Sequence, residues 1–148
     1  MKKITFSLAR AQVFNEVALS SAYRSAKNLL EGQDPARCAM TEADRRLADS
    51  LFDLALGNLL NIVRPFVRDV ANVDEALSIS FEISADWPDH LRLQISKDLA
   101  AYFRHAILGE WLALLNDADA NCQKLEAATR ADAIVESLYL RPRPSRRS

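Results

Sequence analysis

The sequence predicts a mostly α-helical domain of four helices and two short β-strands, in the order β-α-α-β-α-α. Three observations predict it: apolar residues recur at three- and four-residue spacings over most of the chain, two short segments alternate instead, and only 3 of 148 residues are glycine. Because glycine supplies the positive φ angles of tight turns, its scarcity disfavours a turn-rich β architecture. We expect one helical domain over residues 1–140 and an extended Arg/Pro-rich tail over residues 141–148.

Two segments are predicted to be strands with one buried face. Ile4, Phe6 and Leu8 alternate with small or polar residues, and ALSISFEIS over residues 76–84 alternates in the same way. A period of two is typical of a half-buried strand. We expect the two strands to pair with each other and to leave at least one edge that a partner strand could extend.

The first helix is predicted from about residue 10 to Gly32. Glycine is favoured just past a helix end, and Pro35 follows closely. The residues expected to face the core are Val13, Val17, Ala18, Ala22, Ala26, Leu29 and Leu30.

Thr41 and Asp44 resemble a capping box that opens a long second helix over residues 47–72. Pro65 is expected to kink or end this helix. Gly57 is expected to mark a close helix crossing, since a mid-helix glycine otherwise costs up to about 1 kcal/mol. A wide apolar arc predicts that this helix is the central one. The arc contains two stripes, Leu47, Leu51, Leu54, Asn58 and Ile62 beside Phe52, Leu56, Leu59 and Val63.

A third helix is expected to be capped by Asp86, with Pro88 in its first turn, and to continue to about Asn116. Its expected core residues are Leu91, Ile95, Leu99, Tyr102, Ala106, Leu108, Trp111, Leu112 and Leu115. A last helix restarts at Asp117 or Asp119 and stops before Pro142. Its expected core residues are Leu125, Ala128, Ile134, Val135 and Leu138.

The charge is divided unevenly along the chain. All 20 acidic residues and 15 of the 19 basic residues precede position 141, so the body carries a net charge of −5 and the tail carries +4. Four arginines can neutralise about four phosphates in weak, salt-sensitive binding to nucleic acid. Alternating Arg-Pro is also extended, which suits an acidic groove of a neighbouring subunit, and a solvated end is the third alternative. The candidate partner-binding residues of the tail are Arg141, Arg143, Arg146 and Arg147.

The sequence offers no catalytic, cofactor or metal motif. A calcium loop that began at Asp117 would place Cys122 and Ala128 where Gly and Glu are required. His90 and His105 are too few to complete a metal site, and three glycines cannot build a phosphate-cradling loop. We therefore expect a protein that is not an enzyme and that carries no cofactor and no metal.

The cysteines, the tryptophans and the lengths of the apolar runs indicate where the protein is expected to be found. Cys38 and Cys122 lack a CxxC spacing, and Cys122 is expected to be a small core residue. Trp87 and Trp111 are expected to anchor the core, with Trp111 in a partner's groove as the alternative. No run of about 18 uncharged apolar residues predicts a membrane span, and the first residues lack the apolar run of a signal peptide. We expect the protein to be made in the cytoplasm and to have no membrane partner.

Several strings and their order resemble small proteins encoded among the virion genes of Bacteroides-type phages and prophages. The strings are MKKITFSLARAQVFNEVA, the Thr41-led helix, ALSISFEIS, AILGEWLALLN and ESLYLRPRP. More broadly, the layout is similar to the helical head–tail connector and neck proteins of tailed phages. The resemblance implies a non-enzymatic virion assembly protein, a homo-oligomeric ring subunit that contacts portal or tail components. The two strands depart from the simplest all-helical connectors, so the layer of the particle stays open. The alternative is a cytoplasmic helical adaptor or regulator that binds nucleic acid through the tail.

Overall fold

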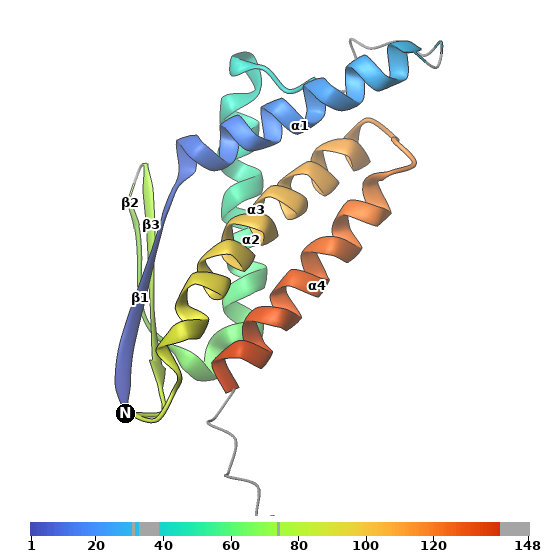
Figure 1. Ribbon diagram of the computed structural model, residues 1–148. Helices are drawn as coiled ribbons and strands as arrows, with labels where there is room; N and C mark the ends of the chain where they lie inside the picture. Colours follow the sequence, from blue (N-terminus) through green and yellow to red (C-terminus); the bar gives the residue numbers. More distant parts are fainter. Residues whose placement is uncertain (31, 33–38, 74, 140–148) are drawn as a thin grey trace, which may run out of the picture.

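A computed structural model of the chain describes residues 1–30, 32, 39–73 and 75–139, and it confirms the mostly helical class (Figure 1). Cys38 and the tail with its four arginines lie outside the described residues. Within them, four helices accompany one small antiparallel sheet. The elements in chain order are β1 (Lys2–Ala9), α1 (Arg10–Leu30), α2 (Arg45–Val63), β2 (Val67–Val73), β3 (Ala76–Ile83), α3 (Arg92–Leu114) and α4 (Ala120–Tyr139).

The sheet has the order β1-β3-β2, and both pairs of strands are antiparallel. Ile4 lies opposite Phe81 and Phe6 lies opposite Ile79, so the predicted pairing of the two alternating segments is confirmed. These four side chains are buried. Figure 1 shows the sheet as a layer beside the helices, and α3 contributes Phe103 to the space next to Phe6 and Ile79.

The third strand, β2, lies where the sequence predicts the end of a long second helix. Pro65 ends the helix, as one of the two expected outcomes, and α2 stops at Val63 before a single 3₁₀ turn. The backbone becomes extended at Val67, with φ −73° and ψ 127°. A bulge between Val67 and Asp69 interrupts the pairing with β3 and removes the regular alternation by which such a strand is recognised.

The capping box is present, and it opens a 3₁₀ turn ahead of α2. The backbone N–H of Thr41 donates to Oδ2 of Asp44 at 2.9 Å. At the far end of α1, Gly32 has φ +80°, which is the left-handed conformation expected of a C-terminal glycine.

α1 buries a different face from the one that the sequence predicts. Val13 and Val17 are buried as expected, but Ala22, Ala26 and Leu30 are exposed. The side chain of Leu29 lies outside the described part of the helix. The physical reason is that small polar residues lie on the buried face of α1. Ser21 is fully buried, and its Oγ accepts a hydrogen bond from Met40 N–H and donates one to Ala18 O. The buried face of α1 is completed by Phe14 and Ser25.

The central helix is α3 rather than α2. It packs against α1, α2 and α4 and against the inner face of the sheet (Figure 1). On α2, only one of the two expected stripes is buried in full. Leu51 joins the buried stripe, whereas Leu54 is 50% exposed, and Leu47, Asn58 and Ile62 are also exposed. The buried stripe of α2 is Phe52, Leu56, Leu59 and Val63.

The ends of α3 and α4 lie close to their predicted places, with one correction. α3 begins at Arg92, after the 3₁₀ turn Asp89–Leu91, so Asp86 does not cap it. Trp87 is buried as predicted, and its Nε1 donates to Ser137 O at 2.8 Å, which ties this turn to the end of α4. Trp111 is also buried within the chain, as predicted for a residue that anchors the core.

The buried face of α4 is built mainly from alanine. Leu125 and Ala128 are exposed rather than buried, and Cys122 is exposed rather than a core residue. Small side chains face α3 because the two helices run close together. The buried residues of α4 are Ala120, Ala127, Ala131, Ile134 and Leu138.

The close helix crossing is at Gly109 and not at Gly57. A Cβ atom at Gly57 would have nothing within 4 Å, so the expected crossing there is wrong within the subunit. A Cβ atom at Gly109 would lie 2.9 Å from Cγ and 3.1 Å from the backbone N of Lys124. The backbone of α4 therefore approaches α3 as closely as glycine allows.

The two glycines should respond oppositely to the same substitution. Gly57→Ala should raise the free energy of unfolding by up to about 1 kcal/mol, because alanine is the better helix former and space is available. Gly109→Ala should lower it by about 1 kcal/mol or more, because the added methyl group overpacks the α3–α4 contact. Urea denaturation measures both, and an equally stable pair of variants would contradict the assigned crossing.

Candidate functional site

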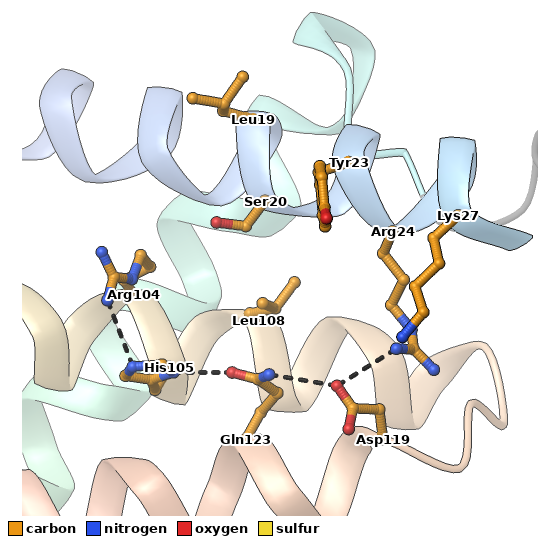
Figure 2. Close-up of a pocket in the computed structure, with 10 residues that line it drawn as sticks. All are labelled: Leu19, Ser20, Tyr23, Arg24, Lys27, Arg104, His105, Leu108, Asp119 and Gln123. Carbon is orange, nitrogen blue, oxygen red and sulfur yellow. Dashed lines mark hydrogen bonds and ion pairs between the residues drawn. The ribbon is translucent and has the colours of Figure 1, made fainter.

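An open groove of about 610 Å³ lies between α1, α3 and the start of α4 (Figure 2). We call it the α1 groove. Its floor, on α3 and the start of α4, carries polar side chains beside the buried Leu108, and its α1 side carries the exposed Leu19 and Tyr23. Lys27 also lines the groove, and its side chain runs next to that of Arg24.

A chain of hydrogen bonds crosses the floor of the α1 groove (Figure 2). Arg104 Nη2 lies 3.3 Å from His105 Nε2, and His105 Nδ1 lies 2.7 Å from Gln123 Oε1. Gln123 Nε2 then donates to Asp119 Oδ2 at 3.2 Å. Because the amide nitrogen of Gln123 is used by Asp119, its oxygen must accept from His105, which places the imidazole proton on Nδ1 and leaves Nε2 as the acceptor for Arg104.

The direction of these bonds decides what the floor can do chemically. Both ring nitrogens of His105 are engaged, and Asp119 accepts from Gln123 and forms an ion pair with Arg24 at 3.4 Å. A general base must be free to take a proton from a bound reactant. These groups hold one another, so the polar floor of the α1 groove is fixed in place by its own hydrogen bonds and ion pair.

Arg24 also connects α1 to the turn between α3 and α4. Its Nε donates to Asp117 Oδ2 at 2.9 Å, and its Nη2 donates to Asp117 Oδ1 at 2.5 Å. Asp117 Oδ1 further accepts from the backbone N–H of Asp119 at 2.8 Å. The Arg24 guanidinium thus holds the pKa of Asp117 below its usual 3.8. Asp117 and Asp119 lie just before α4, close to the place where the sequence predicts that the last helix restarts.

The lowered pKa gives a prediction for acid stability. Ionised Asp117 stabilises the folded state above the usual carboxyl pKa of about 4, and this contribution is lost as the pH falls through the lower pKa of the folded protein. Asp117→Asn should therefore lower the melting temperature at neutral pH, and the difference from the parent should shrink in acid. Asp86→Asn, at an exposed position, is the control and should change little. A difference that grew as the pH fell would contradict the ion pair.

Beyond its mouth, the α1 groove continues onto the outer face of α1. Leu19, Tyr23 and Leu30 are 73%, 75% and 89% exposed. With Ala22 and Ala26 between them they form an uncharged row at three- and four-residue spacings, which we call the α1 outer stripe. Since Val13, Phe14 and Val17 bury the opposite side, α1 is apolar on two faces.

The sheet offers a second candidate surface, and it is the weaker one. β1 and β2 are the outer strands, so each leaves one edge unpaired among the described residues. Lys3 and Asp69 form an ion pair across the outer face at 3.4 Å, and Arg68 pairs with Glu82 at 3.4 Å. Charged side chains near an edge disfavour pairing with another strand. The expected open edge is present, but the α1 outer stripe is better suited to a partner.

The remaining candidate sites add little to these surfaces. Among the described residues, no three His, Cys, Asp or Glu side chains lie together as a metal site would require. No helix in the described part of the chain is long and apolar enough to cross a membrane. The four arginines of the tail lie outside that part. No family model, curated protein or solved structure matches this chain.

Proposed function

We propose that this protein is a non-enzymatic structural subunit that works by associating with other copies of itself and with neighbouring proteins. The resemblance of its layout to virion-region proteins supplies the setting. In that setting it is a ring-forming head–tail connector, neck or tail subunit of a phage particle, assembled in the bacterial cytoplasm.

The observation that carries the proposal is the pair of apolar faces on α1. A surface helix of a monomer normally has one apolar face toward the core and charged residues on the other. On α1, the outer face instead presents Leu19, Tyr23 and Leu30 with alanines between them. Contiguous exposed apolar surface on a protein marks an interaction site. The polar floor of the adjoining groove supports docking, since its groups are already bonded to one another.

Sedimentation of the full chain tests the proposal. We expect a defined oligomer, because the exposed apolar face of α1 must be covered on every copy, and a ring subunit should give more than two copies per oligomer. A monomer at every concentration would contradict self-association. Binding of that monomer to DNA at low salt would then favour the adaptor that uses its tail on nucleic acid.

The tail can be removed to separate its role from that of the body. α4 ends at Tyr139 and its last buried residue is Leu138, so a chain that ends at Leu140 keeps the core. We expect its helical content and melting temperature to match those of the full chain. Association with neighbours should weaken through lost arginine contacts to carboxylates, and raised salt should have the same effect. Arg143→Ala with Arg146→Ala should reproduce part of the loss. Unchanged association in both variants would make the tail a solvated end.

A further inference from the structure

A second apolar surface lies on another side of the subunit, between α2 and α4. It is a groove of about 240 Å³, which we call the α2–α4 groove. Leu54 and Ile62 stand along its α2 side, and both are about half exposed. Its α4 side is lined by Ala127, Ala128 and Ala131. A wall of small side chains leaves room for a helix to approach.

We infer that the α1 outer stripe of one copy packs into the α2–α4 groove of the next copy. The inference rests on the proposed function and names the contact that builds the assembly. The occupant is a second copy of this chain because the chain itself carries both halves of the contact, a row of large apolar side chains on α1 and a groove walled by alanine.

The two surfaces agree in length and in chemistry. At about 1.5 Å per residue, the stripe from Leu19 to Leu30 is about 16 Å long and the groove from Leu54 to Ile62 is about 12 Å long. The residues of the α1 outer stripe are uncharged, and the two charged residues that line the α2–α4 groove, Glu110 and Lys124, neutralise each other in an ion pair at 3.5 Å. The large exposed side chains on the two surfaces offer on the order of 600 Å² of apolar area, close to the apolar share of a small specific interface.

The charges beside the two surfaces are opposite in sign. Lys27 follows Tyr23 by one helical turn beside the α1 outer stripe, and Asp132 follows Ala128 by one turn beside the α2–α4 groove. Both side chains are exposed, and neither forms an ion pair within the described residues. A polar rim of complementary charge around an apolar centre is the usual anatomy of a protein interface.

The symmetry of the contact follows from its two different halves. A contact between unlike surfaces is heterologous, and its repetition gives a closed ring or an open filament, whereas contact between like surfaces stops at a dimer. The inferred packing is therefore sufficient for a ring, when the rotation between copies closes, without a second kind of interface.

Two matched variants test the inference by complementation. Leu19→Glu disables the stripe and Leu54→Glu disables the groove, while Leu93→Glu makes the same change at an exposed leucine of α3 that lines neither surface. We expect each disabling variant to sediment as a folded monomer by circular dichroism and mass. An equimolar mixture of the two should form a one-to-one dimer and nothing larger, because one intact stripe then meets one intact groove. Leu93→Glu should assemble like the parent.

The outcomes separate this contact from the wider proposal. If the parent assembles and both disabling variants assemble as well, or if the mixture stays monomeric, the contact is wrong while self-association stands. If Leu54→Glu alone prevents assembly, the groove holds some other segment and the inference is also overturned. A parent that is itself monomeric overturns both the contact and the proposed function.

Discussion

Replacing Phe103 with alanine should lower the free energy of unfolding by about 3–5 kcal/mol. Phe103 is fully buried on α3, and its ring stacks on Phe52 with centroids 4.5 Å apart and an interplanar angle of 10°. Tyr102 meets it edge-on at 5.2 Å. On its other side it shares a small space with Phe6 and Ile79 of the sheet. The ring thus joins α2, α3 and the sheet. Its removal leaves a cavity between these elements, and they cannot move close enough together to fill it.

Urea denaturation followed by circular dichroism measures this effect. The expected loss is a large part of the roughly 5–15 kcal/mol that holds a typical domain together. Phe103→Leu keeps most of the apolar volume and should lose clearly less. Equal midpoints for the parent and Phe103→Ala would show that α3 is not the centre of the core.

Arg10→Met should be the next most damaging change, at about 2–4 kcal/mol, because it removes two charge-assisted hydrogen bonds and one cation–π contact. Arg10 is a buried arginine at the start of α1. Its Nη2 donates to Asp53 Oδ1 at 2.5 Å and to Asn72 Oδ1 at 2.6 Å, and its guanidinium lies 4.4 Å from the centre of the Phe52 ring. One side chain therefore joins α1, α2 and β2. Methionine keeps an apolar side chain at this position but lacks the guanidinium group. The carboxylate of Asp53, which loses its partner, can still be hydrated.

Lys3→Ala is the matched control for Arg10→Met. Lys3 also joins two distant elements through an ion pair, to Asp69 at 3.4 Å, but both side chains are at least half exposed. An exposed pair contributes about 0–1 kcal/mol and weakens with salt. We expect the loss in Arg10→Met to persist at high salt and the small loss in Lys3→Ala to disappear. Equal losses in the two variants would contradict the importance of burial.

The strands show what local sequence patterns can and cannot predict. β1 and β3 are predictable because one face of each packs against the core, so that buried residues such as Ile4 and Phe6, or Ile79 and Phe81, stand at every second position. β2 is an edge strand with a bulge, so its sequence does not alternate regularly between apolar and polar residues. Its position follows only from the pairing with β3.

The helices were predictable in number and place, but the buried faces were not. The spacing of apolar residues along α1 or α2 does not distinguish a face that packs on the core from an apolar face that is exposed. Ala22, Ala26 and Leu30 were therefore expected inside and lie outside, and the exposed Leu54 of α2 is a similar case. Only the three-dimensional packing shows that α1 has two apolar faces.

The α1 groove was missed for a related reason. Arg24 and Asp117 are separated by 93 positions in the chain, and neither residue stands in a recognisable motif. His90 and His105 are too few for a metal site, and the sequence gives no indication of the partners with which His105 forms its hydrogen bonds. Contacts between distant helices carry this site, and a single sequence has no local signal for them.

Labelling of a thiol at position 26 tests most directly whether the outer face of α1 is covered by a neighbour. Ala26→Cys places the thiol in the middle of the α1 outer stripe, and Cys38→Ser removes a second reactive group. The native Cys122 is exposed on α4 and serves as an internal reference. In the assembled protein, the thiol at position 26 should react many times more slowly than in the same chain carrying Leu54→Glu, while Cys122 reacts at the same rate in both. Equal rates at position 26 in the two chains would contradict the account.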